Sequence, residues 1–304
     1  MRIAIGPSDA DFATAAVQAG GAQVVPLGQP ADGLVWLSPV HLDQLAAALS
    51  DQPGIRWVQL PFAGIENAVA HGLIDSGRTW TCAKGSYARP VAEHALMLAL
   101  AGLRLLPQRV QARTWGAAAG TSLYGARVVI LGGGGITVEL LRLLDPFGVA
   151  ATVVRRQAGQ PVDGAARVVG PESLPEVLPG ARVVFLALAL TPATRRIIGS
   201  AEMDLIGPGG WLVNVARGGH VDTDAVVEAL AAGRLGGAAL DVTDPEPLPD
   251  GHPLWDEPRC IITPHTADTP EMVLGPLTER ITTNVGRFVA GEPMVGLVDP
   301  EAGY

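Results

Sequence analysis

Cysteine is almost absent from the sequence, which has only Cys82 and Cys260 in 304 residues. Two thiols in separate apolar runs cannot build a disulfide framework, and they show no metal-ligand spacing. We therefore interpret both as buried free thiols and predict no metal site.

Positive charge is also scarce. The chain has 21 Lys and Arg against 30 Asp and Glu, a net charge of −9, which argues against nucleic acid or an anionic membrane as the main partner. The longest apolar run, residues 95–106, is too short to span a bilayer and includes Arg104. The N-terminus has too little apolar sequence for a signal peptide. These features predict a soluble cytoplasmic protein.

Apolar residues are abundant, at 48%, and they form β-rich runs that alternate with helical patterns. Strands are expected at 2–5, 22–27, 33–38 and 56–61, and helices at 11–20 and 42–50. A long helix over 90–115, kinked at Pro107, precedes further strands at 126–131, 149–154, 181–190, 210–216, 237–242 and 260–263, and a last helix covers 270–291. This order predicts an α/β fold with two doubly wound parallel-sheet domains.

Residues 131–137, "LGGGGIT", join a predicted strand to a predicted helix, as in a dinucleotide-binding βαβ unit. Gly132 permits the tight turn, and Gly134 lets the backbone approach a pyrophosphate at the helix N-terminus. Thr137 occupies the third glycine position, where a β-branched residue is expected to push the helix outward. The alternative is a glycine-rich turn that binds nothing.

The second strand of this unit ends at Arg155 and Arg156, where NAD-binding units usually carry an acid for the ribose hydroxyls. No carboxylate occurs from Val149 to Pro161. Because guanidinium groups bind phosphate in bidentate fashion, we predict that the two arginines hold the 2′-phosphate of NADP(H). The alternative is a pair of solvated arginines at a strand end.

Four further polar residues follow predicted strands: Arg217, Asp241, Glu246 and His265. The carboxyl ends of parallel strands meet at one edge of a sheet, which is where ligands bind. An arginine can hold a carboxylate and polarise the adjacent carbonyl, and a histidine can supply a proton as hydride arrives. A glutamate beside the histidine orients its ring. The set predicts redox chemistry on a 2-oxo acid.

In this order, "NVARGGHVD" (214–222), "AALDVTDPEPLP" (238–249), "HPLW" (252–255) and "ITPHTA" (262–267) resemble the D-isomer-specific 2-hydroxyacid dehydrogenases. That family includes phosphoglycerate dehydrogenases and glyoxylate/hydroxypyruvate reductases. The glycine turn, "PVAEHALMLAL" (90–100) and "LTPATRRIIG" (190–199) extend the resemblance over nearly the whole chain.

The resemblance implies the catalytic residues Arg217, Glu246 and His265, with Arg217 also binding substrate. It implies that the backbone N–H groups of Ala63 and Gly64, in "PFAGIE" (61–66), bind the substrate carboxylate. The full predicted cofactor site is Gly132, Gly134, Gly135, Ile136, Arg155, Arg156, Leu188, Thr191, Val215 and Asp241.

The same resemblance implies a flavodoxin-like substrate domain of residues 1–92 and 271–304, a Rossmann cofactor domain of 93–270, and a homodimer. The predicted function is reduction of a small 2-oxo acid, such as glyoxylate or hydroxypyruvate, with NADPH preferred and NADH possible. The alternative is a dinucleotide-sensing scaffold, like the family's corepressors. A formate-oxidising relative would carry glutamine in place of Glu246.

Overall fold

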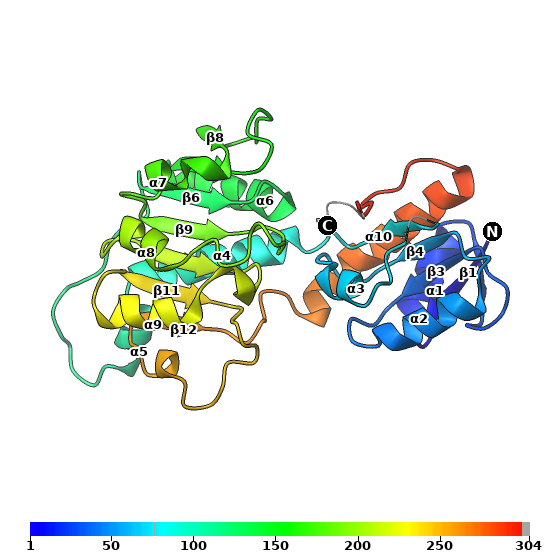
Figure 1. The fold of residues 1–304 in the computed structure, drawn as a ribbon, viewed down its shortest axis with the longest axis horizontal. Helices are drawn as coiled ribbons and strands as arrows, with labels where there is room; N and C mark the ends of the chain where they lie inside the picture. Colours follow the sequence, from blue (N-terminus) through cyan, green and yellow to red (C-terminus); the bar gives the residue numbers. More distant parts are fainter. Residues whose placement is uncertain (76, 300–304) are drawn as a thin grey trace. The chain divides into compact units, whose positions relative to one another are not determined.

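The computed structural model describes residues 1–75 and 77–299, which form two compact units. Unit 1 combines Met1–Tyr87 with the segment that begins at Thr269, and unit 2 is Ala88–Asp268. Each unit is a parallel sheet with helices packed on it, which confirms the predicted fold class (Figure 1). The roles assigned to the two domains stay predictions. Within the described ranges, no helix is both long and apolar enough to cross a bilayer.

Unit 1 has a five-stranded sheet in the order β2-β1-β3-β4-β5. The strands are β1 (Arg2–Gly6), β2 (Gln23–Val25), β3 (Gly33–Trp36), β4 (Trp57–Gln59) and β5 (Thr79–Thr81). The helices are α1 (Asp11–Ala19), α2 (Leu42–Asp51), α3 (Glu66–Ala70) and α10 (Pro270–Ala290). Although α10 comes last in the sequence, it packs against α1, so unit 1 is built from two distant parts of the chain.

The core of unit 1 follows the alternation of side chains along its strands. In β3, Leu34 and Trp36 belong to one buried cluster, and Val35 belongs to the other. In β4, Val58 and Trp57 divide in the same way. Because both faces are covered, β3 and β4 are buried throughout and are apolar except at Gln59, as is typical of buried parallel sheets.

Unit 2 has a seven-stranded sheet in the order β12-β11-β10-β9-β6-β7-β8. Its strands are β6 (Arg127–Leu131), β7 (Ala150–Val154), β8 (Arg167–Val169), β9 (Val183–Leu186), β10 (Trp211–Asn214), β11 (Gly237–Leu240) and β12 (Cys260–Ile262). The α-helices are α4 (Ala88–Leu103), α5 (Leu106–Gln111), α6 (Gly135–Leu144), α7 (Leu174–Val177), α8 (Ser200–Ile206) and α9 (Thr223–Ala231). Short 3-10 helices are η1 (Asp145–Phe147), η2 (Pro171–Ser173), η3 (Gly218–His220) and η4 (Pro253–Trp255).

The predicted long helix over 90–115 is wrong in its extent. It begins at Ala88 and is interrupted between α4 and α5, where Leu105 has a left-handed φ of 54°. The interruption therefore precedes the kink expected at Pro107, which instead lies in the first turn of α5. A proline has no N–H to continue the preceding helix but is tolerated at the start of a new one.

The strand order of unit 2 brings the predicted site segments to one edge of the sheet. The chain runs from β6 outward through β7 to β8 and then returns to β9 on the other side of β6, so its direction of winding reverses between β6 and β9. All pairs are parallel, so the loops that follow these strands lie at the same edge. Ligands of doubly wound sheets bind at such a point.

Candidate active site

The glycine turn presents bare backbone at the start of α6. Gly132 has a φ of 110°, and a Cβ there would lie 2.1 Å from the carbonyl oxygen of Ala187, so only glycine fits. Gly134 is the N-cap of α6, and a Cβ on it would meet no atom within 4 Å. The first helical N–H groups, at Gly135 and Ile136, follow directly. This arrangement suits a phosphate group.

Thr137 is fully buried in the first turn of α6. Its hydroxyl donates a hydrogen bond to the Gly132 carbonyl oxygen at 3.0 Å, so the buried group is satisfied. The outward displacement expected for this helix stays a prediction. The hydrogen bond itself joins the helix to the turn, which a glycine at this position could not do.

Arg155 lies against the glycine turn. An ideal Cβ on Gly133 would be 2.9 Å from the Arg155 Cδ. The Arg155 backbone N–H donates to the Val169 carbonyl, which keeps the residue in line with the end of β7. Its guanidinium faces two neutral amide oxygens, Gln157 Oε1 at 3.4 Å and Gln160 Oε1 at 3.3 Å. Arg156 follows as an exposed residue.

The loop after β9 lies next to this turn, because Gly132 approaches the backbone of Ala187 and Leu188. Within the loop, the Thr194 hydroxyl donates to the Ala189 carbonyl at 2.8 Å and accepts from the Thr191 N–H at 2.8 Å. The predicted cofactor segments after β6 and β9 are therefore brought together. A dinucleotide fits here, since the turn offers uncapped N–H groups, an open Cα face at Gly134 and an adjacent guanidinium.

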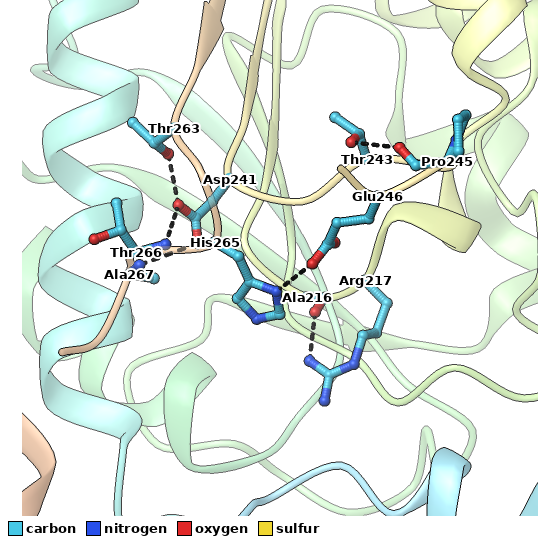
Figure 2. Close-up of polar contacts among 10 residues, drawn as sticks. All are labelled: Ala216, Arg217, Asp241, Thr243, Pro245, Glu246, Thr263, His265, Thr266 and Ala267. Atoms are coloured by element: carbon cyan, nitrogen blue, oxygen red, sulfur yellow. Dashed lines mark hydrogen bonds and ion pairs between the residues drawn. The ribbon is translucent and has the colours of Figure 1, made fainter. Parts of the chain in front are cut away.

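Arg217 is positioned by a buried asparagine at the end of β10. The Asn214 side chain accepts the Ala216 N–H at 3.0 Å and donates to the Arg217 carbonyl at 2.9 Å, which fixes the turn between them. Val215, the remaining predicted cofactor residue, is buried within this turn. The Arg217 guanidinium donates to the Ala216 carbonyl at 2.8 Å (Figure 2).

The Arg217 turn is in direct contact with the loop that carries Glu246. A Cβ on Gly218 would lie 1.9 Å from the Thr243 carbonyl oxygen, so the two backbones approach more closely than any other residue would allow. The Thr243 hydroxyl donates to the Pro245 carbonyl at 2.8 Å and stiffens the second loop. The turn bearing Arg217 and the loop bearing Glu246 are therefore fixed relative to each other.

His265 and Glu246 form an ion-pair geometry, with 2.7 Å between His265 Nδ1 and Glu246 Oε1 (Figure 2). Their side chains are 48% and 40% exposed, so the pair is open to a small ligand. Because Nδ1 donates to the carboxylate, Nε2 is the ring atom that remains to exchange a proton with a substrate. This is the geometry expected of an acid–base histidine with an orienting carboxylate.

Asp241 holds the His265 segment in place. Its buried carboxylate accepts hydrogen bonds from the Thr263 hydroxyl at 2.6 Å and from the N–H groups of Thr266 and Ala267 at 3.0 and 3.1 Å. Its carbonyl accepts the His265 N–H at 2.8 Å, and His265 has a left-handed φ of 49°. Such a conformation persists only where surrounding contacts maintain it. Asp241 therefore lies beneath the acid–base candidate.

His94, on α4, is a part of this site that the sequence did not reveal. Its Nε2 lies 3.3 Å from Asp241 Oδ1 and 3.1 Å from Thr263 Oγ1. Burial alone would raise the pKa of Asp241, but hydrogen bonds from His94, Thr263 and Thr266 outweigh it and hold that pKa below its ordinary value. A lone histidine in an apolar helix gives no signal of such a partner.

Asp268 is a second residue near the site, after His94, that sequence reasoning missed. It follows the His265 segment, and burial raises its pKa even though the charges of His265 and Arg217 act in the opposite direction; Asp241 adds to the rise. The influence of these charges shows that Asp268 shares their electrostatic environment. An acid with a raised pKa beside candidate catalytic groups is a recognised feature of functional sites.

Ala63 and Gly64 lie in unit 1, in the loop between β4 and α3. Neither N–H is hydrogen-bonded to another described residue, so both are available to a ligand. The preceding residue is held, because the Phe62 carbonyl accepts the Ala83 N–H at 2.9 Å. The predicted role of this loop in binding a carboxylate stays a prediction.

Comparison with known proteins identifies relatives along the whole chain. The profile of the D-isomer specific 2-hydroxyacid dehydrogenase NAD-binding domain matches residues 94–267. An uncharacterised protein of Corynebacterium melassecola is 37% identical over 311 residues, covering 100% of both chains. The human glyoxylate reductase/hydroxypyruvate reductase is 30% identical over 211 residues, which cover 67% of this chain and 64% of that protein.

Among solved structures, a D-isomer specific 2-hydroxyacid dehydrogenase from Xanthobacter autotrophicus Py2, in complex with NADPH and MES, has a TM-score of 0.86 and 26% identity. The superposition covers 100% of this chain and 99% of that one. The chain thus shares its fold with a solved D-isomer specific 2-hydroxyacid dehydrogenase.

Proposed function

The chain belongs to the D-isomer specific 2-hydroxyacid dehydrogenase family and is an NAD(P)-dependent enzyme, and from this premise we propose that it reduces a small 2-oxo acid to the D-2-hydroxy acid. The substrate class proposed is that of glyoxylate and hydroxypyruvate, which the human relative's name states, with NADPH as the preferred reductant. The observation that carries the proposal is the 2.7 Å pair of His265 and Glu246, of which Glu246 lies on the loop fixed to the Arg217 turn.

When bound, a reduced nicotinamide supplies a hydride to the oxo carbon. Arg217 binds the substrate carboxylate and polarises the adjacent carbonyl. Binding of a carboxylate by the backbone N–H groups of Ala63 and Gly64 stays a prediction. His265 donates its Nε2 proton to the carbonyl oxygen as that oxygen becomes an alcohol. Glu246 keeps the ring oriented through Nδ1 and stabilises its positive charge before the transfer.

The residues proposed to hold the cofactor are those of the glycine turn and its neighbouring loops. The N–H groups of Gly134, Gly135 and Ile136 would bind the pyrophosphate, and Arg155 and Arg156 would bind the 2′-phosphate. The rest of the proposed cofactor site would be lined by Leu188, Thr191, Val215 and Asp241. NADPH preference is supported by the two arginines, by the missing carboxylate over 149–161, and by the NADPH bound to the Xanthobacter relative.

The proposal is tested by following nicotinamide absorbance with NADPH and NADH against glyoxylate, hydroxypyruvate, pyruvate and a bulkier 2-oxo acid. We expect turnover with NADPH well above NADH. The His265→Ala variant should lose kcat by about 10²- to 10⁴-fold while its NADPH affinity changes little, because it removes only the proton donor. The matched control is His41→Ala, at an exposed histidine. Near-normal activity of His265→Ala, or NADPH binding without turnover of any substrate, contradicts the proposal.

We also propose that the enzyme is a homodimer. Unit 2 exposes several large apolar side chains over residues 106–124, namely Leu106, Val110, Trp115 and Tyr124, and Trp115 is 98% exposed. Exposed apolar groups that gather in one segment mark protein–protein contact surfaces. Light scattering of the purified protein should give twice the mass of the chain.

A further inference from the structure

The cofactor turn contains a glycine, Gly133, that its backbone does not require. Unlike Gly132, its φ lies outside the left-handed region. An alanine could therefore adopt the same backbone conformation. Glycine at position 133 is therefore explained by the atoms that a side chain there would contact.

A side chain at position 133 would meet Arg155. An ideal Cβ on Gly133 would lie 2.9 Å from the Arg155 Cδ, 3.1 Å from its Nε and 3.3 Å from its Cζ. The three contacts run along the side chain up to the guanidinium carbon, so Arg155 crosses the turn directly over Gly133. A methyl group here is incompatible with this position of the arginine.

The charges around Arg155 favour a polyanion. Its side-chain partners, Gln157 and Gln160, are neutral, and within the described ranges no carboxylate lies within ion-pair distance of it. Nearby, α6 begins at a glycine N-cap that has no side chain to accept its N–H groups. A helix N-terminus and a guanidinium both attract negative charge and repel each other until an anion binds.

We propose that Gly133 determines cofactor specificity. By having no side chain, it lets Arg155 lie across the turn, where the guanidinium binds the 2′-phosphate of NADP(H). This inference rests on the proposed NADPH preference and deepens it. The discrimination between NADPH and NADH then depends on two positions together, one supplying the charge and the other supplying the space.

The chemistry of the contact makes the idea testable without unfolding the protein. The clashing atoms belong to a flexible side chain, so an added methyl group displaces Arg155 and leaves the turn in place. Gly133→Ala should therefore act as a partial loss of Arg155. An effect that operates through Arg155 must vanish when Arg155 has already been removed.

The experiment measures the dissociation constants of NADPH and NADH for the full chain by calorimetry. The variants are Gly133→Ala, Arg155→Ala and the double variant, with Gly275→Ala in α10 as the control, since a Cβ on Gly275 meets nothing within 4 Å. We expect Gly133→Ala to weaken NADPH binding about tenfold, as for the loss of one charged hydrogen bond, with NADH nearly unchanged. In the Arg155→Ala background the same substitution should have no effect.

An equal loss of NADPH and NADH affinity, or a loss of NADPH affinity that persists without Arg155, overturns the inference alone. A Gly133→Ala variant that binds NADPH normally, while Arg155→Ala does not, also overturns it and leaves the proposed function intact. If the wild-type chain binds NADPH no better than NADH and Arg155→Ala changes neither, both the inference and the NADPH preference fall.

Discussion

The two units bury the same kinds of polar side chain and use them differently. In unit 1, Asn284 of α10 donates to Gln59 Oε1 at 2.8 Å, and the Thr81 hydroxyl donates to the same oxygen at 2.9 Å. In unit 2, buried Asn214 and Asp241 bond to the loops that follow strands of their own sheet. Buried polar groups therefore join distant elements in unit 1 and orient site loops in unit 2.

The difference teaches that burial of a polar group does not by itself mark a functional site. All three members of the unit 1 network are fully buried, yet their hydrogen bonds serve to connect α10 to the sheet. Asp241 is distinguished by its partners, which are the Thr263 hydroxyl before His265 and the N–H groups of Thr266 and Ala267 after it. The location of the bonded partner, at a strand's carboxyl end, is what separates the two cases.

Among the variants that test this comparison, Asn284→Leu should have the largest effect, which is on the stability of unit 1. The side chain accepts the Val295 N–H and donates to both Gln59 and the Val295 carbonyl, so leucine leaves several buried groups unsatisfied. We expect unit 1 to lose about 3 kcal/mol of stability, measured by denaturant unfolding. NADPH affinity should stay near wild type, and Asn67→Leu, at an exposed position of α3, is the control. A large loss of NADPH affinity in Asn284→Leu would mean that the buried network of unit 1 also serves the site.

An intermediate effect is expected from His94→Phe, which keeps the ring volume and removes the donor to Asp241. The loop that carries His265 loses part of its support, so kcat should fall about tenfold to a hundredfold with little change in NADPH affinity. Asp241 also loses a hydrogen bond that lowers its pKa, so stability should begin to fall at a higher pH on acidification.

The control for this prediction is His71→Phe, at an exposed histidine after α3. A His94→Gln variant, which retains an N–H donor, should recover part of the activity. Equal activity of His94→Phe and wild type would mean that Asp241 needs only its own loop to hold His265.

The smallest effect concerns two acids of unit 2 whose pKa values move in opposite directions. The folded-state pKa of Asp268 is raised, so its ionised form opposes folding, and the stability it contributes below its ordinary pKa is lost as pH rises through the folded value. Asp268→Asn should thus raise Tm by about 1–2 °C at neutral pH, with the gain disappearing on acidification.

Asp241→Asn is the matched variant with the opposite sign. The folded-state pKa of Asp241 is lowered, so its ionised form stabilises the protein above the ordinary pKa, and that stability is lost as pH falls through the folded value. Melting curves from about pH 3, below the ordinary Asp pKa, to about pH 8 should show the two variants diverging as pH rises. Parallel curves would mean that the two pKa values are not shifted in opposite directions.

Much of this architecture could be predicted from residue patterns, because the longer strands are continuous apolar runs and the site residues follow them. The pattern missed the strands β5 and β8 and the short helix α3. Short runs of this kind are also common in loops.

Within the site, the strand-end residues were predictable because parallel strands share an edge. His94 was not, since its partner Asp241 lies in another part of the sequence and helix α4 shows only an apolar pattern around it. The contact between Gly133 and Arg155 was also hidden, because glycine in a turn is ordinarily explained by backbone conformation. Both depend on side-chain positions that the folded backbone alone defines.

The return of α10 to unit 1 also bears on how the chain is made. Asn284 reaches the ribosomal exit only after all of unit 2 has been synthesised, so residues 1–87 wait without the helix that bonds to Gln59. Unit 2, being continuous, is complete first, although its synthesis begins later. A nascent chain that stalls before residue 270 would carry an open apolar face on its N-terminal sheet.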